Sequence, residues 1–294
     1  MEEFGRIQVK FQSQRDSELE KMGEVLPGFI KEKGKFACNR CGNQNIEDFA
    51  VGPCIICQKK CHYCLKCLNM GKVKECCILV AVEEKAPAFL PHSVQLYYKH
   101  SMSKEQEKLS QELVEVMDKE HLVWAVTGAG KTEMIFELIR TVLEKGGRVG
   151  LAAPRIDVCI ELYGRMKEDF SCSISLLHGE SDPYFRTPLV IATTHQLLKF
   201  YQAFDLLIVD EVDAFPYVDN PMLYKAVRNA VKKNGNTLFL TATSTDELDK
   251  KVKKKEIIRY SLPRRFHGNP LVVPEIKWVS KIREKIEKGR IPKE

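Results

Sequence analysis

A glycine-rich turn follows a short apolar run in "VWAVTGAGKTEM", and this segment, residues 123–134, limits the fold more than any other part of the chain. The apolar run "LVWAV" predicts a buried strand, and "EMIFELIRTVLEK" repeats apolar residues at helical spacing. A glycine loop between a strand and a helix is typical of folds in which backbone N–H groups surround a phosphate. The segment therefore predicts a phosphate-binding loop, and a glycine turn without a ligand is the alternative.

The loop residues have separate roles in this interpretation. Glycines let successive N–H groups point at phosphate oxygens, and the helix that follows adds its dipole. Lys131 supplies a charge for the β and γ phosphates, and the Thr132 hydroxyl is expected to bind Mg²⁺. A strict Walker pattern has glycine where Ala125 stands, so the match follows a relaxed rule. The predicted loop consists of Thr127, Gly128, Ala129, Gly130, Lys131 and Thr132.

A second motif, "LLIVDEVDAF", ends another apolar run. Because the carboxyl ends of parallel strands meet at one edge of a sheet, Asp210 and Glu211 are expected beside the phosphate loop. Asp210 would hold Mg²⁺ through its water shell, and Glu211 would position and deprotonate the attacking water. A solvated acidic turn is the alternative for this motif alone. Together the two motifs predict ATP and Mg²⁺ as cofactors and hydrolysis as the reaction.

Short apolar runs recur through the middle of the chain, and most of them precede a helical pattern. They are "LVWAV", "RVGLAA", "ISLL", "LVIAT", "DLLIVD" and "TLFLTA". Buried parallel strands joined by helical crossovers explain this alternation, which predicts an α/β fold with a doubly wound parallel sheet over residues 101–262. A connector is expected over 81–100, with a short strand near 94–98, and residues 1–35 are expected to form a flexible arm.

The charge is unevenly distributed along the chain. Residues 31–80 carry nine Lys and Arg against four Asp and Glu, and residues 250–294 carry fifteen against five. Basic flanks favour contact with nucleic acid, and an ordinary solvated surface is the alternative. Residues 263–294 are expected to be a basic linker or tail, with a helical pattern in "SKIREKIEKGR". The N-terminus lacks the apolar segment of a signal peptide, so a cytoplasmic location is expected.

Nine of the eleven cysteines lie in residues 36–80, which predicts a separate zinc-binding module there. Two residues between thiolates let one turn present both sulfurs to a tetrahedral ion. A module this small, with few large apolar residues, needs such a metal to fold. Closed thiolate sites do no chemistry, so the module is expected to hold a strand or a partner. The cysteines are Cys38, Cys41, Cys54, Cys57, Cys61, Cys64, Cys67, Cys76 and Cys77.

These motifs resemble the superfamily 2 helicases and, more narrowly, the late-competence DNA-uptake ATPases of the ComFA type. The resemblance covers residues 36–275 and is carried by the cysteine cluster with "WAVTGAGKTEM", "LAAPRIDV", "TTHQLLKFY", "DEVDAFPY", "LTATST" and "LPRRFHGNPL". It implies a RecA-like lobe of an ATP-driven single-stranded DNA translocase in natural transformation. It also implies ComFC, DprA and a membrane DNA channel as partners. A replication-restart helicase and a non-hydrolysing module that binds ATP and DNA are the alternatives.

The resemblance also assigns roles to residues outside the two nucleotide motifs. It places Pro154, Arg155, Thr193, Thr194 and His195 along the backbone of a single DNA strand, and a core or capping role is the alternative for His195. Thr241 and Thr243 are implied to couple the nucleotide state to strand movement. Gln106 matches the adenine-reading position, and a surface glutamine is the alternative.

The resemblance further implies how the cysteines pair. Cys38, Cys41, Cys64 and Cys67 are implied to bind one zinc ion, because "YCLKCLNMGKV" is similar to the second knuckle of the family. That leaves Cys54, Cys57 and Cys61, with Cys76 or Cys77 as the fourth ligand, for a second ion. His62 is a reserve ligand, although a solvent-facing histidine is favoured.

Superfamily 2 motors hydrolyse ATP between two lobes, and an arginine from the second lobe stabilises the transferring phosphate. That arginine is worth on the order of a thousandfold in rate in related NTPases. No such motif follows "LPRRFHGNPLVVPE", so the chain is expected to hold the first lobe and to turn ATP over slowly. Arg264 and Arg265 are substitutes by position, but a basic linker is the favoured interpretation.

Overall fold

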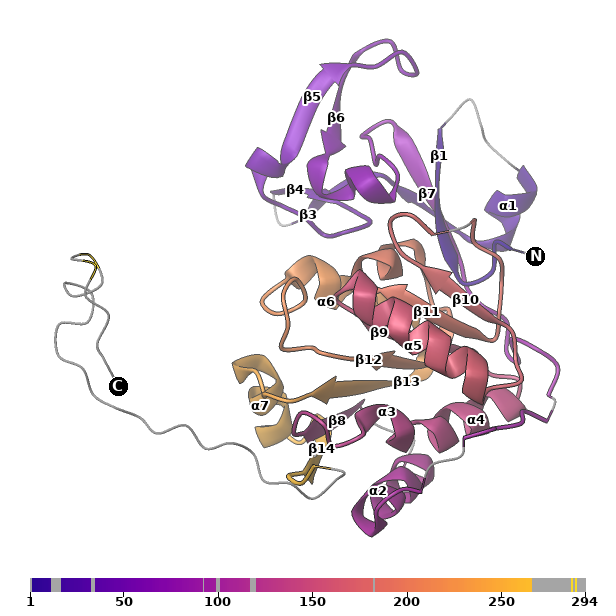
Figure 1. Ribbon diagram of the computed structural model, residues 1–294. Coiled ribbons are helices and arrows are strands. Elements are labelled where there is room, and N and C mark those ends of the chain that lie inside the picture. Colours follow the sequence, from indigo (N-terminus) through magenta and orange to yellow (C-terminus); the bar gives the residue numbers. More distant parts are fainter. Residues whose placement is uncertain are drawn as a thin grey trace.

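The computed structural model contains a parallel sheet with helices on both faces, and an antiparallel unit packed beside it (Figure 1). Among the described residues, no helix is long and apolar enough to cross a bilayer. The predicted C-terminal helix in "SKIREKIEKGR" lies outside the described residues except at positions 287 and 289. The structure describes residues 2–11, 17–32, 35–91, 93–98, 101–116, 120–181 and 183–265, with 287 and 289.

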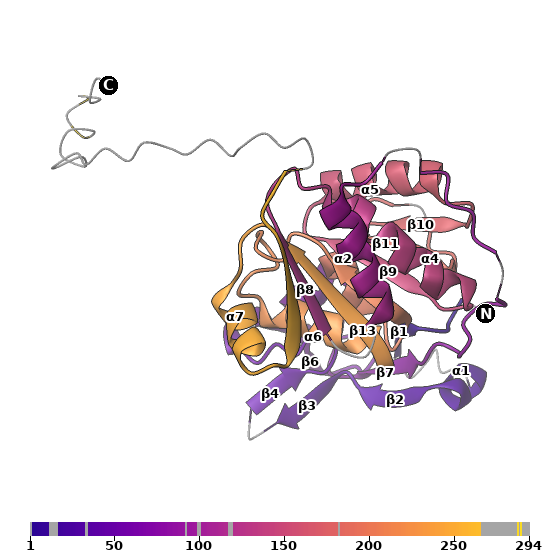
Figure 2. The ribbon, with the colours of Figure 1, turned by 90° about the horizontal axis from the view of Figure 1, so that it is seen from below.

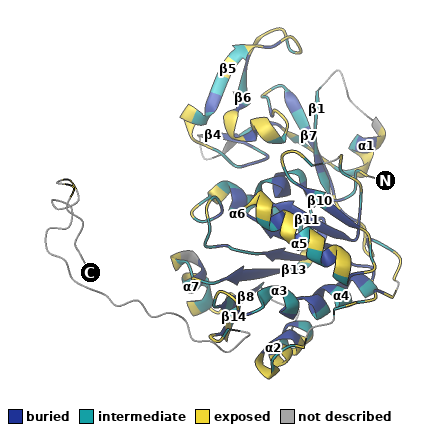
Figure 3. Ribbon diagram, viewed as in Figure 1, coloured by how far each residue is buried: buried dark blue, intermediate teal, exposed yellow. Residues whose placement is uncertain are grey.

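The larger sheet has seven parallel strands in the order β10-β11-β9-β12-β13-β8-β14. Strands such as β9 and β11 are buried along their whole length, as expected for a parallel sheet covered on both faces (Figure 3). This arrangement confirms the predicted doubly wound α/β sheet. The strands are β8 (Glu120–Ala125), β9 (Val149–Ala153), β10 (Ile174–Leu177), β11 (Leu189–Thr193), β12 (Phe204–Val209), β13 (Val231–Thr241) and β14 (Ile257–Leu262).

Helices lie on both faces of this sheet (Figure 2), and a separate apolar core lies on each face. Because successive strand residues point to opposite faces, Val123 belongs to the core that contains residues of α2, α4 and α5, whereas its neighbour Leu122 joins the core that contains residues of α6, α7 and the antiparallel unit. The helices are α2 (Lys104–Glu115), α3 (Lys131–Met134), α4 (Phe136–Glu144), α5 (Ile156–Asp169), the 3-10 helix η4 (Thr194–Lys199), α6 (Pro221–Ala230) and α7 (Asp246–Lys253).

The antiparallel unit begins well before the first cysteine. A flexible arm is expected over residues 1–35, but β1 and β2 pair with the two edges of β7 instead. β7 is almost fully buried, so its backbone groups need partners on both sides. The elements are β1 (Arg6–Phe11), α1 (Ser17–Met22), β2 (Glu24–Pro27), β3 (Phe29–Glu32), β4 (Lys35–Cys38), η2 (Ile46–Asp48), β5 (Phe49–Pro53), β6 (Lys60–Cys64), η3 (Leu65–Met70) and β7 (Cys77–Val82).

Two strand predictions need correction. The expected strand near 94–98 is only an isolated bridge between Leu96 and Phe170. Conversely, β14 pairs with β8 at the edge of the sheet and was not predicted. Only its end residues, Ile257 and Leu262, are buried, as expected for an edge strand that has a neighbour on one side.

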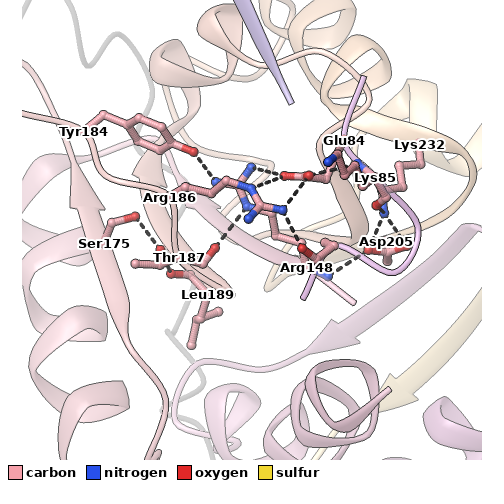
Figure 4. Close-up of polar contacts among 11 residues, drawn as sticks. Glu84, Lys85, Arg148, Ser175, Tyr184, Arg186, Thr187, Leu189, Asp205 and Lys232 are labelled. Atoms are coloured by element: carbon pink, nitrogen blue, oxygen red, sulfur yellow. Dashed lines mark hydrogen bonds and ion pairs between the residues drawn. The ribbon is translucent and has the colours of Figure 1, made fainter. Parts of the chain in front are cut away.

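A buried ion network fixes the connector to the amino-terminal ends of the parallel strands (Figure 4). The Glu84 carboxylate lies 3.1 Å from Arg148 Nη1 and 2.7 Å from Arg186 Nη2, and the Glu84 and Arg148 side chains have 0% exposure. Beside them, Asp205 accepts a hydrogen bond of 2.8 Å from the Arg148 backbone N–H and pairs with Lys232. The edge opposite the phosphate loop is therefore held by an ion network whose central pair, Glu84 and Arg148, is fully buried.

Replacing Glu84 with glutamine is expected to lower the free energy of unfolding by about 3–5 kcal/mol, because two arginines lose their buried counter-charge. Glu83→Gln is the matched control: Glu83 is 53% exposed and forms a surface pair with Lys233. Its loss should cost less than about 1 kcal/mol. Urea unfolding measures both variants, and equal losses would contradict the role given to the network.

Candidate nucleotide site and cysteine centres

The predicted phosphate loop lies between β8 and α3, at the carboxyl edge of the parallel sheet. Gly128 and Gly130 have φ values of 78° and 74°, in the left-handed region that favours glycine. A Cβ atom at Gly130 would lie 2.3 Å from Gln106 Nε2, so this position also needs glycine for space. The loop therefore has the backbone geometry that a phosphate cradle requires.

A cavity of about 480 Å³ opens beside this loop. It brings together the loop, the first acidic residue of the DEVD segment and the start of α2. Such a volume is within the range of small-ligand sites. The lining residues are Tyr98, Gln106, Gly128, Ala129, Gly130, Lys131, Thr132, Glu133, Arg165 and Asp210.

Gln106 is buried, at 2% exposure, and is not the surface glutamine of the alternative interpretation. Its Oε1 accepts from the Ser103 backbone N–H at 2.7 Å, which completes a capping box at the start of α2. Its Nε2 donates to the Ala129 carbonyl oxygen at 2.8 Å. The side chain thus ties α2 to the phosphate loop.

The acidic motif follows β12 at the same edge of the sheet. Burial raises the pKa of Asp210, and the nearby Lys131 ammonium opposes that rise. The backbone N–H of Glu211 donates to Asp210 Oδ1 at 2.8 Å, and Glu211 has a φ of 50°, which is uncommon for a residue with a side chain. The Glu211 carboxylate lies 3.4 Å from Arg155 Nε. Asp210 therefore faces the loop, whereas Glu211 faces a predicted DNA contact.

Asp213, the last letter of the DEVD segment, is a site residue that sequence reasoning missed. Its Oδ1 accepts from the Thr241 hydroxyl at 2.7 Å, and its Oδ2 accepts from the Thr243 hydroxyl. Burial alone would raise the pKa of Asp213, but these two hydroxyls, a backbone hydrogen bond and the nearby Lys131 ammonium together lower it. The fixed spacing of three residues after Asp210 was the available signal. Asp213 connects the ends of β12 and β13.

The five predicted DNA contacts lie at the ends of β9 and β11, which are neighbours in the sheet. Thr193 and Thr194 are buried at 6% and 0%, and the Thr194 hydroxyl oxygen is among the fully buried side-chain atoms. Burial lowers the pKa of the half-buried His195. Pro154 is buried too, and Arg155 is the exposed member of the set. A strand along this edge would therefore meet Arg155, His195 and backbone groups.

The cysteines gather into two groups of four, and within each group the sulfur atoms lie within 4.8 Å of one another. In the first group, Cys38 Sγ lies 3.8 Å from Cys67 Sγ, and Cys41 Sγ lies 3.6 Å from Cys64 Sγ. Tetrahedral zinc with Zn–S bonds of about 2.3 Å places its sulfurs about 3.8 Å apart, so these spacings fit the ion. The groups are Cys38, Cys41, Cys64 and Cys67, then Cys54, Cys57, Cys61 and Cys76.

The surroundings of the cysteines distinguish the candidate ligands from their neighbours. Cys77 is buried in β7, where its sulfur accepts from the Lys74 backbone N–H at 3.3 Å. His62, the reserve ligand, pairs with Glu75 at 2.9 Å instead. The backbone N–H of Cys57 and other donors lower the pKa of Cys54 to about 6, which favours the metal-binding thiolate. Both groups therefore have the donor chemistry of zinc sites.

The phosphate loop and the DEVD segment at one edge of the parallel sheet define a superfamily 2 helicase-like ATPase domain, here preceded by a module with two tetracysteine groups. Residues 7–81 match the family described as Competence protein ComFA N-terminal domain, and residues 99–246 match Type III restriction enzyme, res subunit. The chain belongs to the ComFA family of competence proteins.

Three relatives show how far this similarity extends. Competence protein ComFA of Streptococcus pneumoniae is 53% identical over 278 residues, which cover 93% of this chain and 62% of that protein. ComFA of Bacillus subtilis is 39% identical over 264 residues, covering 88% and 56% respectively. Replication restart protein PriA of Bacillus subtilis is 24% identical over 185 residues, covering 58% and 23%. The chain thus spans less than two thirds of the length of either ComFA relative.

Proposed function

We propose that the chain is the ATP- and DNA-binding part of a motor that moves single-stranded DNA during natural transformation. Lys131 and the loop N–H groups bind the ATP phosphates, while Thr132 and Asp210 hold Mg²⁺. Glu211 positions and deprotonates the attacking water. The two cysteine groups bind zinc, which fixes the fold of the N-terminal module.

One observation carries this proposal: the DEVD segment contacts two different parts of the carboxyl edge of the parallel sheet. Asp210 lines the cavity beside the phosphate loop, and Asp213 holds the hydroxyls of Thr241 and Thr243. A change in the nucleotide at one end of this segment reaches β13 within a few residues. That arrangement suits a protein that converts hydrolysis into movement, rather than one that only stores ATP.

The DNA partner is supported by the other groups at the same edge. Arg155 is exposed at the end of β9 and shares a carboxylate, Glu211, with the hydrolytic site. A DNA phosphate that binds Arg155 would free the Glu211 carboxylate from its ion pair with that arginine. ATP turnover would then depend on the bound DNA strand. Arginine and backbone N–H groups bind phosphates without regard to base sequence, as a translocating protein requires.

Replacing Glu211 with glutamine is expected to leave ATP binding intact and to lower DNA-stimulated phosphate release by about 10²–10⁴-fold, because the general base is lost. Glu161→Gln, an exposed position on α5, is the matched control and should behave like the parent protein. Single-turnover hydrolysis with and without oligothymidylate measures the effect. Equal rates for Glu211→Gln and the parent would refute the role of Glu211, and no turnover in the parent would favour a non-hydrolysing binding module.

The partner proteins ComFC and DprA, and a membrane DNA channel, are proposed from family membership. The two ComFA proteins are 53% and 39% identical over 93% and 88% of the chain, whereas PriA of Bacillus subtilis is 24% identical over 58% and PriA of Rickettsia prowazekii 22% over 75%, so DNA uptake is favoured over replication restart. Co-purification of this chain with each named partner tests the assignment.

A further inference from the structure

A second groove, of about 910 Å³, lies between the cysteine module and α6. It has no lining residue in common with the cavity beside the phosphate loop. One wall is the loop that follows the first Cys-x-x-Cys pair, together with η3. The opposite wall is the segment that follows the DEVD motif. His195 also lines the groove. The lining includes Gln44, Lys66, His195, Phe215, Lys225 and Arg228.

The groove carries net positive charge. Lys66, Lys225 and Arg228 line it, and no Asp or Glu occurs among its described lining residues, although Lys66 pairs with Asp48 at 3.4 Å outside the lining. Lys225 Nζ donates to the Asn39 carbonyl oxygen at 3.1 Å, a neutral partner that leaves the charge in place. The remaining polar groups include the side-chain amides of four Asn and Gln residues. A concave surface with one sign of charge concentrates ligands of the opposite sign, so the groove suits a polyanion.

An aromatic ring stands in the same groove. Phe215 is 84% exposed, although a phenyl ring gains nothing from contact with water. Exposed rings beside cationic side chains are typical of surfaces that bind single-stranded nucleic acid, where bases stack on the rings and cations meet the phosphates. His195 lines the groove and also belongs to the edge where the strand is proposed to bind. The groove therefore continues that edge toward the cysteine module.

The first tetracysteine group forms part of one wall. Cys41 belongs both to that group and to the groove lining. The next residue, Gly42, has a φ of 77°, and a Cβ atom there would lie 2.9 Å from Lys225 Cδ. The cysteine loop thus packs closely on α6, and its position depends on the group that holds Cys41.

We propose that this groove binds one strand of nucleic acid, with Lys66, Lys225 and Arg228 on its phosphates and Phe215 stacked on a base. The first tetracysteine centre holds the wall opposite α6, so it shapes the DNA site without lining the ATP site. This inference deepens the proposed function by giving the DNA a second contact surface on the cysteine module.

Binding of a fluorescent oligothymidylate to the full chain tests the proposal. Phe215→Ala is expected to weaken binding about five- to a hundredfold, the range for loss of one base stack. Arg228→Gln should reduce the slope of log Kd against log salt concentration by about 0.7, the value for one phosphate contact on a single strand. Phe185→Ala, at a ring that is 50% exposed outside the groove, and Lys167→Gln, exposed on α5, are the matched controls.

Parent-like affinity and salt slope in both groove variants would overturn the proposal. Binding of polyglutamate that the same variants weaken, with oligothymidylate binding unchanged, would overturn it in favour of an acidic protein partner. These results are separate from the proposed function, because ATP binding does not involve the groove residues. A parent protein that binds oligothymidylate through Phe215 but does not bind ATP would support the groove as a nucleic-acid site and refute the proposed motor function.

Discussion

Replacing Lys131 with alanine is expected to weaken ATP binding at least about a hundredfold while the fold stays intact. The ammonium group donates charge-assisted hydrogen bonds to the β and γ phosphates, and two such bonds contribute roughly 3 kcal/mol or more. Lys131 lines the cavity beside Asp210, where no other lysine is among the described lining residues. Titration with a fluorescent ATP analogue in the presence of Mg²⁺ measures the loss.

The matched control for this experiment is Lys145→Ala. Lys145 is exposed at the end of α4, which follows the phosphate loop and α3. Its substitution removes one positive charge, as Lys131→Ala does. It should retain the affinity of the parent protein. Circular dichroism melting shows whether either variant has lost its fold. Parent-like ATP affinity in a folded Lys131→Ala protein would remove the basis for the phosphate-loop assignment.

Elemental analysis is expected to return two zinc ions per chain, and removal of both should unfold the N-terminal module. Structural zinc contributes about 10–16 kcal/mol in small metal-binding peptides, which is as large as the whole stability of an ordinary domain. Cys38 and Cys64 lie in the same apolar core as Phe200 and Phe204 of the helicase domain. Chelation should therefore lower the melting temperature of the entire chain, and not only that of the module.

Adjacent cysteines provide a sharp control for the second ion. Cys76 belongs to the second group of four, whereas Cys77 points into the core of β7. Cys76→Ser should reduce the zinc content from two ions to one, and Cys77→Ser should keep both. The reverse result would show that the two ligands have been exchanged, and a folded protein without zinc would contradict both centres.

The parallel sheet could be predicted from the sequence because each buried strand is a short, nearly continuous apolar run. β1 and β2 were missed because their stability depends on pairing with β7. In the case of β2 that partner lies more than fifty residues away in the sequence, and a local sequence pattern does not report such pairing. The edge strand β14 has an alternating pattern with a charged residue in it, which weakens the signal further.

The candidate site was likewise predicted only in part. Motif spacing placed Lys131 and Asp210 at one edge, since a strand end fixes the position of the residue that follows it. Spacing does not report burial, so Thr194 was predicted as a DNA contact although its side chain has 0% exposure. Nor does it report hydrogen bonds between strand ends, which is why the role of Asp213 emerged only from the structure.

The core shared by the two units restricts how this protein can move. Ile7 and Leu79 of the antiparallel sheet belong to the same apolar cluster as Phe200 and Phe204, and the backbone N–H of Tyr201 donates to the Gly5 carbonyl oxygen at 3.0 Å. Closely packed cores do not deform gradually. We therefore expect the cysteine module to keep its position relative to the helicase domain. A change in the width of the groove is then expected to come from side chains and from the short segment around Phe215.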